Sequence, residues 1–140
     1  AKELNSRIKL VDSVYYFSYA YCTTTEAPIF GNQVPTKDTM GVLMVPAGMI
    51  GAYTNNRADA QMVIDETWKP NDGLVNVISA QHPTDDAYVD YVAGETRVKS
   101  GQWYVFPTLT GDHGTVIGMK GNTDETRKFY MDHIAIIDSL

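Results

Sequence analysis

The segment WKPNDGLVNVIS, residues 68–79, joins a tight turn to a short apolar run. Pro70 and the run from Asn71 to Gly73 favour a turn, because Asn and Asp bond their own backbone and Gly accepts a positive φ. Residues 74–78 are mostly apolar or β-branched and are bounded by turn residues, which predicts a buried strand. Asp72 is therefore expected to be held rigidly at the boundary of a strand.

A second turn, residues 111–114 (Gly-Asp-His-Gly), follows a strand-like run from Trp103 to Leu109. Ligands of open α/β sheets bind where loops leave the strand ends, so Asp72 and His113 are placed to share one site. The order of acid and then histidine matches the last two members of an α/β-hydrolase triad, whose serine comes earlier in the chain. The 140 residues contain no Gly-x-Ser-x-Gly motif.

Each of these residues also has an ordinary explanation. Asp72 can simply close an Asx-turn, and His113 can be a turn residue, so the sequence pattern alone leaves both interpretations open. His82, which precedes Pro83, and His133, beside the apolar stripe of the last helix, are predicted to be structural or surface residues. The acidic residues at 85, 86 and 90 lack the spacing of a calcium-binding loop, so a solvated loop is the better interpretation.

Composition excludes several classes of function. With 140 residues, 44% of them hydrophobic and 20% charged, the chain is expected to form one ordered domain over residues 1–140. The net charge of −6 disfavours nucleic acid and anionic membrane surfaces as partners. Cys22 is the single cysteine, so an internal disulfide and a multi-cysteine metal site are excluded. No run approaches the ~20 apolar residues of a membrane-spanning helix, and no cofactor is expected.

An α/β architecture follows from the distribution of strands and helices. Residues 14–21 are aromatic and β-branched and are apolar on both faces, which is typical of a covered strand in a parallel sheet. A third strand is predicted at 102–106. Because long, partly helical connections separate these strands, we expect a sheet of about three parallel strands with flanking helices.

The connections are expected to be as follows. An amphipathic helix is predicted at 2–11, a long surface loop at 23–39, and a short buried helix at 40–50 that is interrupted near Pro46. The last helix is predicted to begin at Asn122, where Glu125 completes a capping box. It is expected to bury a stripe that consists of Phe129, Tyr130, Ile134 and Ile137.

Two motifs together carry a family resemblance, namely the run from Asn71 to Asn76 and Asp112-His113 followed by Val-Ile-Gly at 116–118. Looser matches are residues 2–5, 14–18, 64–68 and 101–103. With these residues in order along the whole chain, the sequence resembles the C-terminal part of secreted bacterial triacylglycerol lipases of the Bacillus, Geobacillus and staphylococcal type.

This resemblance implies an α/β-hydrolase fold, of which residues 1–140 would be the C-terminal portion with the nucleophile half absent. It implies that Asp72 is the acid and His113 the base of a Ser-His-Asp triad that hydrolyses carboxylic esters of lipids. The serine, the oxyanion hole and most of the lid would precede Ala1. The intact parent is therefore expected to be a secreted lipase or esterase, and the 140-residue chain alone is expected to be inactive.

One departure from the family concerns a metal. Relatives bind a structural calcium through acidic residues just after the histidine, and the matching positions here are Thr115 and the cation Lys120. No metal site is therefore predicted. By the strand order that the resemblance implies, residues 14–20 would lack a partner strand on one side. We expect that edge to pair with the N-terminal portion of the same enzyme or with a second copy of the chain.

Two alternatives stay open. The chain can be a non-catalytic binding or interaction domain that retains a hydrolase-like fold. It can also keep the fold and perform a different reaction, such as acyl transfer.

Overall fold

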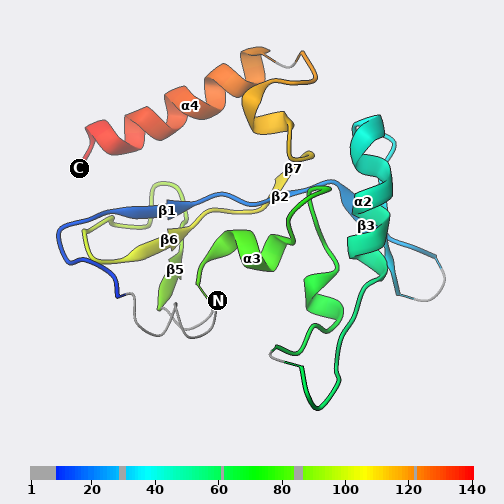
Figure 1. Ribbon diagram of the computed structural model, residues 1–140. Coiled ribbons are helices and arrows are strands. Elements are labelled where there is room, and N and C mark those ends of the chain that lie inside the picture. Colours follow the sequence, from blue (N-terminus) through cyan, green and yellow to red (C-terminus); the bar gives the residue numbers. More distant parts are fainter. Residues whose placement is uncertain (1–8, 29–30, 61, 84–86, 122) are drawn as a thin grey trace.

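The computed structural model describes residues 9–28, 31–60, 62–83, 87–121 and 123–140 (Figure 1). The strands are β1 (Tyr16–Ser18), β2 (Tyr21–Cys22), β3 (Thr24–Glu26), β4 (Gln33–Pro35), β5 (Tyr88–Asp90), β6 (Trp103–Val105) and β7 (Leu109–Thr110). The helices are α2 (Gly41–Ala52), α3 (Val77–Gln81) and α4 (Thr123–Asp138), with 3-10 turns η1 (Glu66–Trp68) and η2 (Thr115–Ile117). The helix predicted at 2–11 lies mainly outside the described residues, and residues 9–11 are not helical.

Parallel pairing forms the centre of the molecule, as predicted. One sheet has the strand order β1-β6-β5 and a second pairs β2 with β7, all in parallel, whereas β3 and β4 form an antiparallel hairpin. Within the described part of the chain, β1 lies at an edge of its sheet. The hairpin corrects the expectation of an irregular loop at 23–39, where no alternation of apolar and polar residues had marked the strands.

The segments β1–β2 and β6–β7 run side by side as one long pair (Figure 1). Between the two registered parts, Phe106 N donates to Ser18 O (3.0 Å) and Leu109 N donates to Ala20 O (2.9 Å). The segment that joins β6 to β7 thus contains one residue more than the segment that joins β1 to β2, as in a β-bulge. The longer segment includes Pro107, which has no backbone N–H to donate. This pair confirms the strands predicted at 14–21 and 102–106.

The predicted strand at 74–78 is wrong. Asp72 N donates to Val75 O (3.0 Å) and Val77 N donates to Pro70 O (2.9 Å), so the segment folds back on itself instead of joining a sheet. Its end forms α3, and Leu74 is 52% exposed. The third strand of the sheet is instead β5.

Helix α4 lies across the sheet, above β1 and β6 in Figure 1. Phe129 and His133 pack against Tyr19, with ring centroids 4.8 and 5.4 Å from the tyrosine ring, and His133 Nδ1 is hydrogen-bonded to Tyr19 Oη (2.8 Å). The stripe predicted from apolar residues is therefore only partly right, because Tyr130, Ile134 and Ile137 are exposed. His133 lies on the sheet-facing side of the helix and gives the Tyr19 hydroxyl a polar partner, which is consistent with the structural role predicted for this histidine.

Helix α2 runs from Gly41 to Ala52 without the interruption expected near Pro46. One face is buried through Leu43, Ala47 and Gly51; a Cβ at Gly51 would lie 2.1 Å from Gln33 O, so the lack of a side chain lets β4 lie against the helix. The opposite face carries large apolar side chains that are exposed by about 70% or more, namely Val42, Val45 and Met49. The expectation that this helix is buried thus holds for one face only.

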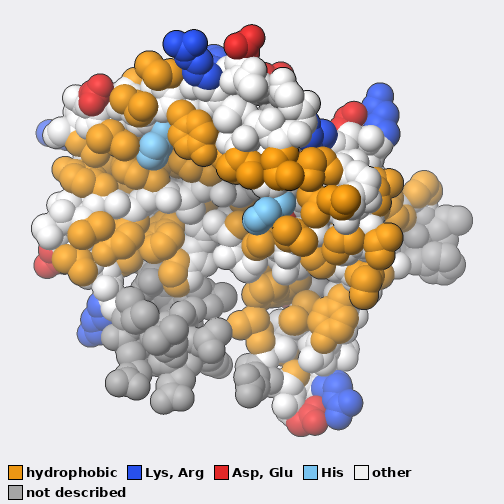
Figure 2. All heavy atoms as spheres, turned by 45° about the horizontal axis from the view of Figure 1, so that its top comes forward, with side chains coloured by type: hydrophobic (Ala, Val, Ile, Leu, Met, Phe, Trp, Pro, Cys, Tyr) orange, Lys and Arg blue, Asp and Glu red, His pale blue; other side chains and the backbone are white. Residues whose placement is uncertain are grey.

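Hydrophobic side chains also cover a broad area of one face of the molecule, with histidine side chains among them (Figure 2). A helix that is apolar all round, as α2 is, is typical of one covered on all sides. None of the helices described is long and apolar enough to cross a membrane.

Candidate active site

The acid turn, residues 71–73, fixes the carboxylate of Asp72 by backbone contacts. Asp72 Oδ1 accepts hydrogen bonds from Leu74 N (2.9 Å) and Val75 N (2.8 Å). Gly73 has φ +101°, and a Cβ there would approach Leu43 Cβ to 2.9 Å, so no larger residue fits without a shift. Asp72 is 8% exposed, and its second oxygen, Oδ2, points to the histidine described below.

Asn71 attaches this turn to the rest of the fold. Its side chain is fully buried and donates from Nδ2 to Lys69 O (2.9 Å) and to Ala47 O of α2 (3.2 Å), while its Oδ1 accepts from Gly73 N (2.9 Å). Its backbone oxygen accepts from Thr23 N just past β2 (2.9 Å). Asp72 therefore lies at the carboxyl end of the parallel strands, although the described residues directly before and after it do not form a strand.

The histidine turn, residues 111–114, leaves β7 at the same end of the sheet. Gly111 N donates to Cys22 O (3.0 Å), and His113 N donates to Asp72 O (2.8 Å). The His113 imidazole Nδ1 lies 2.8 Å from Asp72 Oδ2. The expected contact between Asp72 and His113 is thus present, and a backbone hydrogen bond between the same two residues reinforces it.

The carboxylate determines which nitrogen of His113 carries the proton. An ionised carboxylate only accepts hydrogen bonds, so neutral His113 holds its proton on Nδ1 and leaves a lone pair on Nε2. The histidine side chain is 50% exposed, and no described residue forms a hydrogen bond with Nε2. An imidazole oriented in this way can accept a proton from a hydroxyl placed beside Nε2, which is the geometry of a general base.

Sequence reasoning did not single out Asp112, the residue before the histidine, as a functional candidate. Its carboxylate is fully buried, and Oδ2 accepts from Met40 N at the start of α2 (2.8 Å). Burial would raise the pKa of this carboxyl, but the Met40 N–H, the Lys120 ammonium and the Thr115 hydroxyl together lower it below its ordinary value. The signal in the sequence was weak, since an aspartate between a glycine and a histidine looks like any turn residue.

The residues that follow the histidine do not fit a calcium ion. Lys120 Nζ lies 3.4 Å from Asp112 Oδ2, so a side-chain cation already faces the buried carboxylate. Calcium requires six to eight oxygen ligands. Across the described ranges, no three His, Cys, Asp or Glu side chains gather in a way that could hold a metal ion.

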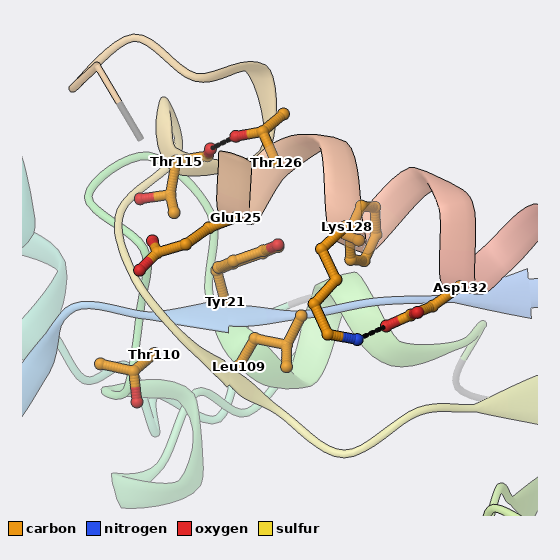
Figure 3. A pocket seen from close by; sticks show the side chains of 9 residues that line it. Tyr21, Leu109, Thr110, Thr115, Glu125, Thr126, Lys128 and Asp132 are labelled. Carbon is orange, nitrogen blue, oxygen red and sulfur yellow. Dashed lines mark hydrogen bonds and ion pairs between the residues drawn. The ribbon is translucent and has the colours of Figure 1, made fainter. Parts of the chain in front are cut away.

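The other sequence candidates lie elsewhere. His82 stacks on Tyr88 with ring centroids 3.8 Å apart, and its Nδ1 contacts Pro83 O (2.8 Å), which is consistent with the predicted structural role. Asp90 is exposed, and positions 85 and 86 are outside the described residues. A cavity of about 320 Å³ beneath α4 borders η2 at Thr115, but neither Asp72 nor His113 lines it (Figure 3).

Comparison with known proteins shows the family to which the chain is similar. The family described as "Lipase-like, C-terminal domain" matches residues 1–138. A lipase from Staphylococcus hyicus is 31% identical over 119 residues, which make up 84% of this chain and 17% of that protein. The structure of EstA from Clostridium botulinum has a TM-score of 0.87 at 34% identity, covering 99% of this chain and 32% of that one.

The crystal structure of the Staphylococcus hyicus lipase has a TM-score of 0.80 at 28% identity, and the match covers 99% of this chain and 35% of that one. The chain therefore spans only about a third of the length of the solved relatives and a smaller share of the curated lipase. Because the family match extends over nearly all of its residues, the chain belongs to the lipase-like C-terminal domain family.

Proposed function

We propose that this chain is the C-terminal portion of an α/β-hydrolase that hydrolyses carboxylic esters of lipids. Asp72 and His113 would be the acid and the base of its Ser-His-Asp triad, and the nucleophilic serine would lie in a segment before residue 1. The observation that carries the proposal is the 2.8 Å contact between His113 Nδ1 and Asp72 Oδ2 at the carboxyl end of parallel strands. Membership of a lipase-like family supports the choice of lipid esters.

In the proposed reaction each of the two residues has its own step. Nε2 of His113 takes the proton of the serine hydroxyl as the serine oxygen attacks the ester carbonyl, and then gives that proton to the leaving alcohol. Asp72 holds the Nδ1 proton and stabilises the imidazolium that forms between these two transfers. Because Leu74 N and Val75 N already engage Asp72 Oδ1, Oδ2 keeps its direction toward the histidine throughout.

An exposed apolar helix face and an edge strand indicate a protein partner, and the upstream portion of the same protein is the partner that we propose. The outward face of α2 exposes Val42, Val45 and Met49. In the described part of the chain, β1 (Tyr16–Ser18) lies at the edge of its sheet and contains no charged residue that would protect the edge. We propose that the N-terminal portion packs against this face and pairs with this edge. A second copy of the chain at the β1 edge is the alternative partner. Secretion of the parent is proposed from the family resemblance.

Two forms of the protein test the proposal. The intact parent should hydrolyse p-nitrophenyl esters and emulsified triacylglycerol, and His113→Ala should abolish turnover while the unfolding temperature stays close to that of the wild type. His133→Ala is the matched control, because this histidine contacts Tyr19 and not Asp72. The isolated 140-residue chain should show no turnover above its own His113→Ala variant. Full activity of the intact His113→Ala protein would refute the role of the histidine.

The same assay separates the two alternatives. A non-catalytic interaction domain predicts that the intact parent hydrolyses no ester under any condition. Acyl transfer predicts that an added alcohol is acylated in preference to water, and product analysis by mass spectrometry would show this.

A further inference from the structure

The buried carboxylate of Asp112 joins the histidine turn to helix α2. Its Oδ1 accepts from Gly114 N and from Thr115 Oγ1, both at 3.1 Å, so the carboxylate closes the turn that carries His113. Its Oδ2 accepts from Met40 N, the residue that precedes α2 (2.8 Å). Met40 offers no side-chain cap and the first turn of α2 has no acidic residue, so Asp112 supplies the negative group that the start of this helix favours.

Helix α2 also holds the acid turn. Asn71 Nδ2 donates to Ala47 O in the middle of the helix, and Gly73 packs directly on Leu43. Both turns are thus attached to helix α2. The turn that carries Asp72 contacts the middle of the helix, and the turn that carries His113 contacts the start of the helix through Asp112. The distance between the imidazole and the Asp72 carboxylate depends on both attachments.

Lys120 completes the second attachment. The chain returns through η2 and the left-handed residue Gly118 (φ +72°), which brings Lys120 Nζ to 3.4 Å from Asp112 Oδ2. A carboxylate that is removed from water and bonded only by neutral donors keeps an uncompensated charge, and a buried charge without a partner is strongly destabilising. The ammonium of Lys120 compensates that charge.

We propose that Lys120 is a positioning residue, whose ammonium holds the Asp112 carboxylate against the start of α2 and so keeps His113 aligned with Asp72 without a bound calcium ion. The inference rests on the proposed function of His113 as the base of a hydrolase. Lys120 touches neither Asp72 nor His113 in the described contacts and acts only through Asp112.

The test uses the intact parent protein with Lys120→Met, Lys120→Arg and the control Lys128→Met. Lys128 pairs with Asp132 on the exposed surface of α4 and does not contact Asp112. A shift of about 1 Å in a reacting group can cost about 10²-fold in rate. We therefore expect Lys120→Met to lower kcat by about 10- to 100-fold with little change in KM, Lys120→Arg to restore most of it, and Lys128→Met to match the wild type.

A second measurement does not depend on activity. The proton between His113 Nδ1 and Asp72 should give a slowly exchanging downfield NMR signal in the wild type and in Lys120→Arg, and a broadened or absent signal in Lys120→Met. The unfolding temperature of the wild type should be the same in EDTA and in millimolar CaCl₂.

Outcomes that overturn the inference are distinct from those that overturn the proposed function. An intact protein that hydrolyses no ester defeats the proposed function, while the NMR signal and the calcium test still decide the role of Lys120. A Lys120→Met protein with wild-type kcat and an unchanged signal overturns the inference. If Lys120→Met does not fold, a wild type that unfolds at a lower temperature in EDTA than in calcium overturns it, and an unchanged temperature supports it.

Discussion

Replacing Asp72 by asparagine tests the proposed catalytic pair with little disturbance of the fold. The amide oxygen of asparagine can take the place of Asp72 Oδ1 and keep the hydrogen bonds from Leu74 N and Val75 N. The amide nitrogen then faces His113 Nδ1, and it is a donor where the carboxylate oxygen was an acceptor. His113 consequently turns its Nδ1 lone pair to the amide and carries its proton on Nε2, where it can no longer accept one from a serine.

The expected loss is large because this change affects the transition state more than the bound substrate. The equivalent change in a serine protease triad lowers kcat by about 10⁴-fold, or about 5 kcal/mol of transition-state stabilisation. We expect a similar loss in kcat for the intact protein and little change in KM. Asp72→Ala is a poorer test, since it leaves two backbone donors without an acceptor at a cost of about 1–3 kcal/mol of stability.

The assay is hydrolysis of a p-nitrophenyl ester by the intact protein, with thermal unfolding measured on the same samples. Asp65→Asn is the matched control, because Asp65 Oδ1 accepts from Thr67 N (3.0 Å) in a similar turn that is exposed and carries no histidine. Asp72→Asn activity within about tenfold of the wild type, with Asp65→Asn also unchanged, would refute the assignment of Asp72 as the acid, since a wrong tautomer costs far more.

Gly73→Ala should destabilise the protein by about 1–3 kcal/mol, because the position has φ +101° and the new Cβ would lie 2.9 Å from Leu43 Cβ. Chemical denaturation should show a much smaller effect for Gly94→Ala, which has a positive φ but open space around it; equal effects would mean that the contact with Leu43 is unimportant. Burial, with the neighbouring Tyr91 and Tyr21, raises the pKa of Tyr19 from 10.0 to about 12. The unfolded chain therefore loses this proton first, and the free energy of unfolding should fall as the pH rises from about 10 to about 12. Denaturation at several alkaline pH values should show a shallower decline for Tyr19→Phe, and an unchanged slope would contradict the burial of this phenol.

The parallel pair and the contact between acid and histidine were predictable because their signals are local and strong. The aromatic run at 14–21 and the run at 102–106 become β1–β2 and β6, and the glycines beside Asp72 and His113 marked the two turns. The family resemblance added the expectation that these turns meet.

Other features depend on contacts that a linear pattern does not contain. Residues 74–78 look like a strand, but Asn71 pairs with Asn76, and the Asn76 side chain donates to Trp68 O, so the turn closes before a strand can form. A five-residue apolar run cannot distinguish these outcomes. Asp112 was missed for a related reason, because its role depends on its contacts with Met40 and Lys120. Met40 is distant from Asp112 in the sequence, and η2 separates Lys120 from it.

The long parallel pair has a consequence for the way the chain folds during synthesis. Tyr16 pairs with Trp103, so β1 can pair with β6 only after the residues between them have been synthesised. Pairings between residues so distant in sequence form slowly, because closing the intervening loop costs conformational entropy before any native contact offsets that cost. The turn that carries Asp72 is fastened beside β2, and the turn that carries His113 follows β7. We therefore expect the two residues to meet only after this pair has closed, so that the site forms late in the folding of this chain.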